Sequence, residues 1–325
     1  AQYHRTHESW IAYLDDEARA EIDPQWIRSK RWHGVISRHT TPALVKECAE
    51  LKIPLVDLND TPLFPKVPKI RPDNHGVGRM GADHLVERGH RSFGFSGFKN
   101  DGWARERRDG FVDGLRASGH RCEVFDVDYP GDLSPVWDAK QTAVLATWLR
   151  RLPRPTAVMA CNDMRALQVV AAAQEAGLRV PEEIAVLGVN NDTIRCELAY
   201  PPLSSVATNG FQSGYAAAEL LAQLMQGEPP PSLDRRIPPR EVVVRPSTDM
   251  LAIDDKNVAA ALSHIREHAC RGLTVNEVLR HAAASRSQLE RKFRRLLGRT
   301  PQAEIRRVQM AKIRQLLIET DIPLK

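Results

Sequence analysis

The sequence has 325 residues, of which 42% are hydrophobic and 27% are charged, and its formal net charge is +5. This composition is typical of a soluble globular protein with two or three domains, and it excludes a disordered or fibrous chain. No run of 18 apolar residues occurs in the sequence, which excludes a membrane-spanning helix.

Short apolar runs alternate with helical patterns through the first 256 residues. Strands are predicted at Gly34–Ser37, Ile53–Asp57, Ser92–Ser96, Ala157–Cys161 and Ile184–Val189. Apolar residues three and four apart predict helices at about 41–51, 76–88, 103–118, 140–151, 163–176 and 211–226. Because the strands are continuously apolar and alternate with helices, the pattern favours a parallel, doubly wound α/β architecture.

A glycine-rich stretch, Gly76 to Gly81, satisfies the G-x-G-x-x-G pattern of dinucleotide-binding folds. It follows Arg71-Pro-Asp-Asn-His instead of an apolar strand, so the required context is missing. We therefore predict the start of a closely packed helix here and no cofactor.

Polar residues follow two of the predicted strands. Asn162 and Asp163 follow one strand, and Asn190, Asn191 and Asp192 follow another. One such pair alone favours a helix cap. Two clusters at neighbouring strand ends favour a polar ligand, because open parallel sheets bind ligands beyond the carboxyl ends of their strands.

The five cysteines are scattered and lack Cys-x-x-Cys spacing, and the eleven histidines form no His-Glu-x-x-His pair. We predict neither a disulfide framework nor a metal site, and the reducing cytoplasm as the location. No catalytic constellation is visible in the sequence, so an enzyme is not predicted.

A domain boundary is predicted after a proline-rich segment that carries the β-rich run Glu241–Arg245. The proposed division is 1–248, an acidic linker at 249–256, and 257–325. The charge changes at this boundary: residues 257–325 hold 14 Lys and Arg against 6 Asp and Glu, whereas residues 1–256 hold 32 against 35. Such asymmetry indicates a polyanionic partner for the C-terminal segment.

Two short helical patterns separated by a tight break occupy residues 274–301. Thr274 with Glu277 forms a capping-box pattern, Ser285 is suited to cap the second helix, and Gly298 to end it. The second pattern is amphipathic, with a polar face crowded by arginines and amides. This arrangement favours a helix-turn-helix that reads DNA in the major groove. The alternative is a solvated basic helix on a small α-domain.

Two family resemblances follow from these motifs. Residues 73–118, with DNHGVGRMGADHLVERGH, and residues 157–206, with AVMACND and IAVLGVNND, resemble the ligand-binding core of LacI/GalR-type repressors. Residues 282–301 match the pattern A-x-x-S-x-x-x-L-x-R-x-F-x-x-x-x-G-x-T-P of AraC-type DNA-binding domains. A periplasmic-binding-protein-like sensor fused to an AraC-type domain is the arrangement of xylose operon regulators.

The first resemblance implies a sensor of two lobes that close on a sugar, with crossovers near 98–100, 206–210 and about 230. It implies ligand contacts at Asp73, Arg107, Asn162, Asp163 and Asn190. The family usually has Asp where this chain has Asn190, which leaves the identity of the sugar open, because an amide both donates and accepts. For Arg107 the alternative is a surface salt bridge with Glu106 or Asp109.

The second resemblance carries two departures from its family. Ala283 stands where the family commonly has Gly, so a left-handed turn there is expected to be strained by about 1 kcal/mol. AraC-type domains have a second helix-turn-helix, and this chain stops where that unit is expected to begin. Since the first strand of the sensor is also expected before Ala1, the sequence is interpreted as a fragment of a longer protein.

Together these features predict a sugar-responsive transcription regulator, an activator of xylose or pentose catabolic genes that acts as a homodimer on operator DNA. Base contacts are predicted for Ser287, Gln288 and Arg291, and phosphate contacts for Arg286, Arg294, Arg295 and Arg299. D-xylose or a related pentose is the predicted effector, and no membrane partner is predicted. The alternative is a sugar-binding or solute-binding module without a DNA role.

Overall fold

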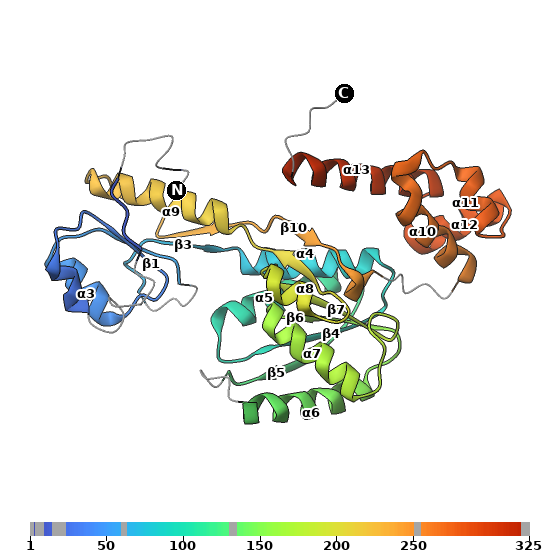
Figure 1. Cartoon of the computed structure of the whole chain (residues 1–325), viewed down its shortest axis with the longest axis horizontal. Coiled ribbons are helices and arrows are strands. Elements are labelled where there is room, and N and C mark those ends of the chain that lie inside the picture. The colour runs from blue at the N-terminus through green and yellow to red at the C-terminus, as the bar shows by residue number, and fades with distance from the viewer. Residues whose placement is uncertain are drawn as a thin grey trace.

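The computed structural model describes residues 3, 10–14, 24–59, 64–129, 135–249 and 255–319. Within these ranges the chain forms two parallel-sheet lobes, joined side by side, and a separate helical domain at the C-terminal end (Figure 1). None of the described helices is both long and apolar enough to cross a membrane.

The first lobe is built on a four-stranded parallel sheet with the order β1-β2-β3-β9. Its elements are η1 (Pro24–Ser29), β1 (Val35–Ser37), α3 (Pro42–Glu50), β2 (Leu55–Asp57), β3 (Lys69–Pro72), α9 (Gly210–Met225) and β9 (Asp234–Ile237). Leu220 and Leu221 of α9 pack against Val56 and Ile70 of the sheet, and burial of these side chains holds the helix on the lobe.

The second lobe is built on a six-stranded sheet with the order β10-β8-β7-β6-β4-β5. Its strands are β4 (Ser92–Phe98), β5 (Cys122–Val127), β6 (Thr156–Ala160), β7 (Ile184–Val189), β8 (Ser204–Ala207) and β10 (Glu241–Val243). Its helices are α4 (Asn74–Glu87), α5 (Gly102–Ala117), α6 (Pro135–Arg151), α7 (Asp163–Glu175), α8 (Thr193–Leu198) and η2 (Pro246–Thr248). Every strand pair is parallel except β8 with β10. The predicted α/β architecture is confirmed.

The five strands and six helices predicted for this region are all confirmed, with bounds shifted by a few residues. The pattern missed β3, β5, β8, β9 and the short α8. Three of these strands carry charged residues, such as Arg71 in β3, Glu123 in β5 and Asp234 in β9. Charges interrupt the apolar runs from which strands are predicted.

The described chain crosses between the lobes at 72–74, 207–210 and 238–240. The crossover implied near 206–210 is confirmed, but those implied near 98–100 and about 230 are wrong. β4 ends at Phe98 inside the second sheet, paired on both sides, so the chain has already crossed before it. The unpredicted β3 is the strand that precedes this first crossing.

The helices α4 and α5 lie in backbone contact on one face of the second sheet. A Cβ atom added to Gly78 would lie 2.0 Å from the carbonyl oxygen of Arg107, and one added to Gly110 would lie 2.0 Å from that of His75. The prediction of a closely packed helix at Gly76–Gly81 is therefore confirmed, and the glycines serve helix packing.

The C-terminal domain is a helical cluster with its own core. It consists of α10 (Lys256–His268), η3 (Ala269–Arg271), α11 (Val275–His281), α12 (Arg286–Leu297) and α13 (Pro301–Glu319). Leu262 and Ile265 of α10 pack with Val278 of α11, Phe293 of α12 and Ile305 of α13. Residues 250–254 of the expected linker and residues 320–325 lie outside the described ranges.

The contact at Gly78 predicts a large effect of one methyl group. We expect Gly78→Ala to lower the free energy of unfolding by about 3 kcal/mol, because neither facing backbone is able to move freely. Gly214→Ala in α9 is the matched control, since nothing lies within 4 Å of an added Cβ there. It should be neutral or stabilising by up to about 1 kcal/mol. Equal urea midpoints for the two variants would contradict the packing role.

Candidate functional site

The second sheet has a topological switch point between β4 and β6. From β4 the chain runs outward to β5, then returns to place β6 on the other side of β4 and continues to β7 and β8. Ligands of open α/β sheets bind beyond the carboxyl ends of strands at such a point. The loop before α5 and the residues Cys161–Asp163 flank it here.

Arg107 lies at this switch point and is only 3% exposed. Its Nε donates to Asn74 Oδ1 at 2.9 Å, and its Nη1 donates to the carbonyl oxygen of Cys161 at 2.7 Å. The surface salt bridge considered as an alternative is not formed, since Glu106 bonds Arg71 and Asp109 bonds Arg108. Arg107 therefore connects the start of α4, α5 and the end of β6.

Asp163 joins the two polar clusters that follow β6 and β7. It is 2% exposed, and its carboxylate accepts from Ser205 Oγ at 2.6 Å and from the backbone N of Asp192 at 2.7 Å. Burial raises the pKa of Asp163, and the two hydrogen bonds oppose that shift. Because both oxygens have partners, Asp163 braces the loop 190–192 beside the strand end.

The remaining predicted ligand residues lie at element ends. Asp73 caps α4 by accepting from Gly76 N at 3.0 Å, and Asn162 caps α7 by accepting from Arg165 N at 2.8 Å. Asn190 is exposed and has φ of 105°, and its backbone N donates to Val206 O at 3.0 Å. A capping carboxylate or amide keeps further hydrogen-bonding capacity, so capping is compatible with ligand contact.

An aromatic group at the same end of the sheet was missed by the sequence reasoning. The Arg107 guanidinium lies 4.9 Å from the ring centroid of Trp103, and Trp103 meets Phe98 edge-on at 6.4 Å. The ring centroid of Tyr129, two residues after β5, lies 4.9 Å from that of Phe98. A tryptophan at the first position of the predicted helix 103–118, which follows a strand, is the signal that could have found this group. Aromatic walls with a few convergent polar groups are typical of small-molecule sites.

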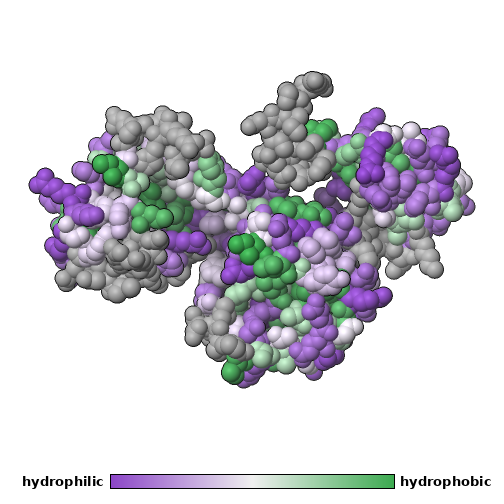
Figure 2. Space-filling model, viewed as in Figure 1, coloured by the Kyte–Doolittle hydropathy of each residue, from purple (hydrophilic) through white to green (hydrophobic). Residues whose placement is uncertain are grey.

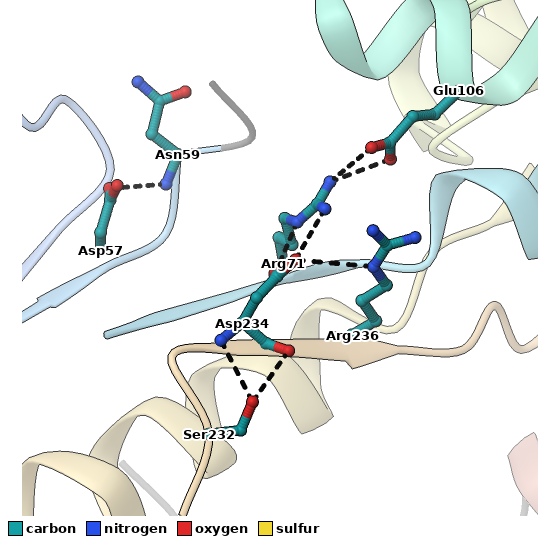
Figure 3. A network of polar contacts seen from close by, with 7 residues as sticks. All are labelled: Asp57, Asn59, Arg71, Glu106, Ser232, Asp234 and Arg236. Carbon is teal, nitrogen blue, oxygen red and sulfur yellow. Dashed lines mark hydrogen bonds and ion pairs between the residues drawn. The ribbon is translucent and has the colours of Figure 1, made fainter. Parts of the chain in front are cut away.

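An ion network joins the two lobes beside this site (Figure 3). Arg71 of β3 is 7% exposed and donates to Asp234 of β9 in the first lobe at 2.7 and 2.8 Å. The same guanidinium donates to both oxygens of Glu106, on α5 of the second lobe, at 2.9 and 3.0 Å. Arg236, two residues along β9 from Asp234, approaches the Asp234 carboxylate at 3.6 Å. The buried guanidinium of Arg71 thus forms ion pairs with one carboxylate from each lobe.

The ion pairs of this network shift the pKa values of Asp234 and Arg71. The hydrogen bonds from Arg71 hold the pKa of Asp234 below its ordinary value. Bonds to Asp234 and Glu106 raise the pKa of Arg71, so it stays charged. At the adjacent strand end, Asp57 accepts from Thr40 Oγ1. It also accepts from the backbone N of Asn59 (Figure 3). These contacts fix the end of the first sheet that faces the second lobe.

The helix-turn-helix geometry predicted for residues 274–301 is observed. Capping boxes start both helices, at Thr274 with Glu277 and at Ser285 with Gln288. Gly298 ends α12 with φ of 67°. Ala283 has φ of 47°, so the predicted left-handed turn without a glycine is confirmed.

One face of α12 is buried and the other is open. Leu289 and Phe293 are fully buried, and the polar residues predicted to contact DNA are exposed with one exception. The exposed residues are Arg286, Ser287, Gln288, Arg291, Arg294 and Arg295. The exception, Arg299, is half-buried and forms an ion pair with Glu304, which is 1% exposed. Figure 2 shows hydrophilic side chains covering much of the visible face of this domain.

Three exposed residues of α12 also have intramolecular partners, and one of them is Ser287, whose Oγ lies 3.5 Å from Ser285 Oγ. Gln288 Oε1 accepts from the backbone N of Ser285 at 3.4 Å, and Arg286 Nε forms an ion pair with Glu290 at 3.1 Å. These contacts are exposed and therefore weak. Arg291, Arg294 and Arg295 extend from the same helix toward solvent.

A cavity of about 470 Å³ lies on the C-terminal domain and not in the lobes. It is lined by His264, His268, Arg271, Leu273, Glu277, Arg280 and His281, and it contains none of the residues predicted to bind sugar or DNA. Among the described residues, no group of three or more His, Cys, Asp or Glu has the geometry to hold a metal ion.

Comparison with known sequence families separates the chain into the same two parts. The periplasmic binding protein-like domain matches residues 82–248, which is more than half of the chain. The helix-turn-helix of bacterial regulatory proteins of the AraC family matches residues 265–306.

Characterised relatives match nearly the whole chain. The xylose operon regulatory protein of Escherichia coli (strain K12) is 32% identical over 97% of this chain and 81% of its own length. That of Haemophilus influenzae is 30% identical over 97% of this chain and 82% of its own length. The solved structure of a xylose-binding transcription activator superposes with a TM-score of 0.64 at 31% identity, covering 99% of this chain and 83% of that one.

The network around Arg71 predicts a pH-dependent loss of stability. We expect Arg71→Met to lower the free energy of unfolding by about 2 kcal/mol at neutral pH, because it removes the buried cation that Asp234 and Glu106 share. The depressed pKa of Asp234 stabilises the fold above its ordinary value of 3.8, and this contribution is lost as the pH falls through the folded pKa. The deficit of the variant should therefore shrink below pH 3.8. Denaturation of wild type, Arg71→Met and the exposed control Arg116→Met at several pH values checks this, and a deficit independent of pH would contradict it.

The turn at Ala283 predicts a stabilising substitution. Ala283→Gly should raise the stability of the C-terminal domain by about 0.5–1 kcal/mol, since glycine adopts positive φ without strain. The same change at the exposed helical residue Ala303 should lower stability by about 1 kcal/mol. The midpoints of thermal unfolding of the two variants should thus move in opposite directions. A shift in the same direction would exclude strain at Ala283.

Proposed function

This chain belongs to the family of xylose operon regulatory proteins and is a sugar-responsive, DNA-binding transcription regulator; on that premise we propose that it binds a pentose between its two lobes and activates pentose catabolic genes. The observation that carries the proposal is the presence of two parts in one chain: a polar switch-point site around Arg107, and an exposed basic helix, α12. We assign residues 1–248 to the sugar sensor, 249–256 to the linker and 257–325 to the DNA-binding domain.

Five residues are proposed to contact the sugar: Asp73, Arg107, Asn162, Asp163 and Asn190. Arg107 is held by hydrogen bonds to Asn74 and Cys161, and its planar guanidinium is proposed to donate to ring or hydroxyl oxygens of the sugar. Asp163 contributes mainly by positioning the loop that carries Asn190. Trp103 is proposed as the apolar wall of the site, since it lies directly against Arg107.

The effector is proposed to be D-xylose or a related pentose. The names of the relatives support xylose, whereas Asn190 introduces a group that donates as well as accepts. Its left-handed backbone is one that asparagine tolerates better than most residues, so the loop geometry itself favours asparagine here.

Ser287, Gln288 and Arg291 are proposed to read base edges, and Arg286, Arg294, Arg295 and Arg299 to bind phosphates. Arg299 is the least exposed of these residues and forms an ion pair with Glu304, so we expect its phosphate contact to be the weakest. A single recognition helix provides few base contacts, and we therefore propose that a homodimer binds two half-sites in the cytoplasm. A solute-binding module without a DNA role is less favoured, because it gives no reason for the basic face of α12.

Sugar binding is tested by calorimetric titration of the whole chain with a panel of pentoses and hexoses. We expect heat with D-xylose, and binding at least about tenfold weaker in Arg107→Lys, because lysine lacks the planar fork of donors. Arg108→Lys is the matched control on the same helix, since Arg108 bonds Asp109 and Asp126 outside the site. If folded protein gives no heat with any sugar, the sensor assignment is wrong.

DNA reading is tested by selecting binding sites from a randomised duplex pool. Arg291→Ala should relax the preference at one base position by about 1–3 kcal/mol. Arg294→Ala should weaken binding to all sequences alike and reduce the slope of affinity against salt by about one. Indistinguishable sequence preferences and salt slopes in both variants would overturn the division into base and phosphate contacts.

A further inference from the structure

The helix α4 extends from the proposed sugar site to the C-terminal domain. Its first residue, Asn74, is fully buried and accepts the hydrogen bond from Arg107. Its last residue, Glu87, forms an ion pair with Arg307 of α13 at 3.6 Å. Fourteen residues of α-helix span about 20 Å, so one continuous element covers the distance between the two functional parts. In Figure 1, α13 projects from the helical domain back over the second lobe, on the side where α4 lies.

The last turn of α4 also holds the start of the linker. Arg88 Nε donates to the carbonyl oxygen of Thr248 at 2.9 Å, and His84 Nε2 lies 3.1 Å from Thr248 Oγ1. Thr248 is fully buried, and its hydroxyl donates to Ser204 Oγ of β8 at 2.7 Å. The point where the chain leaves the second lobe is therefore fixed to α4 by a buried polar network.

The body of α4 has little freedom to bend or slide. Its backbone touches that of α5 at Gly78 and at Gly110, where no Cβ atom fits. A displacement at Asn74 or Arg107 is therefore transmitted along the helix, because tightly packed helices shift as units between discrete arrangements.

The contact at the far end of the helix is suited to switching. The side chains of Glu87 and Arg307 are 52% and 38% exposed, and exposed ion pairs contribute little free energy. Arg307 is at the same time anchored to the buried Glu304 by two hydrogen bonds of 3.0 and 2.8 Å, so it belongs rigidly to the C-terminal domain. A weak, exposed ion pair of this kind forms or breaks when α4 moves, while α4 and the C-terminal domain both stay folded.

We propose that α4 couples the sugar site to the DNA-binding domain, and that its C-terminal end, through Glu87 and Arg307, is the surface on which that domain docks. The DNA-binding domain is docked in one of the two states of the sugar site, sugar-bound or sugar-free, and is released in the other. This inference rests on the proposed function, since it requires that sugar changes DNA affinity. The coupling is the change in DNA affinity that sugar binding causes.

The test compares the DNA affinity of the whole chain with and without D-xylose, by fluorescence anisotropy on a duplex selected by the wild-type protein. The ratio of the two dissociation constants is the coupling factor. We expect Glu87→Arg, which places two cations opposite each other, to reduce this factor about 2–5-fold, and Glu87→Gln to reduce it less. Xylose heat and helical content should be unchanged, because Glu87 touches neither the sugar site nor a hydrophobic core.

Glu175→Arg is the matched control. Glu175 is the exposed last residue of α7 in the same lobe, so the charge change and the position in the helix are the same, and its coupling factor should equal that of wild type. If wild type responds to xylose and Glu87→Arg responds equally, the docking inference is wrong while the proposed function stands. If wild-type DNA affinity does not change with xylose although xylose binds, both are wrong.

Discussion

At Gly78 and Gly110 the backbones of α4 and α5 meet so closely that an added Cβ atom would lie 2.0 Å from the facing carbonyl oxygen. This contact sets the direction in which Arg107 leaves α5, and Arg107 then reaches Asn74 and the carbonyl oxygen of Cys161. It also fixes the position of the C-terminal end of α4. Thr248 and the C-terminal domain contact that end. A loss of close packing here would disturb the proposed sugar site and the interdomain contact together.

The lobes are connected by charge as well as by chain crossovers. Arg71 binds Asp234 of the first lobe and Glu106 of the second, and Glu106 is the immediate neighbour of Arg107. A buried guanidinium between two carboxylates is directional, because its planar donors match carboxylate geometry only in particular orientations. These ion pairs thus constrain the relative orientation of the lobes. One of them involves Glu106, which is next to Arg107, a proposed sugar contact.

The two parts of the protein use hydrogen bonding in different ways. In the second lobe the polar side chains near the switch point are buried or half-buried, apart from Asn190, and several are already bound to the protein, as Asp163 is to Ser205 and Asp192. On α12 the arginines are exposed and carry few intramolecular contacts. A small polar ligand is selected by a few fixed groups, whereas a polyanion is first attracted by accessible charge.

The sequence by itself determined the local features: the strands and helices with clear periodicity, the capping box at Thr274, the helix cap at Ser285, and the left-handed turn at Ala283. Each of these depends on residues within one or two turns of each other, so a local pattern is enough to predict it. Tertiary structure decided the rest. It decided the charged strands β3 and β9, the crossover at 72–74, and the partners of Arg71 and Arg107. The side chains that bond Arg71 and Arg107 lie 33 to 163 positions away in the sequence. Burial and pairing at such separations follow from packing of the lobes, and no periodic pattern in the sequence predicts them.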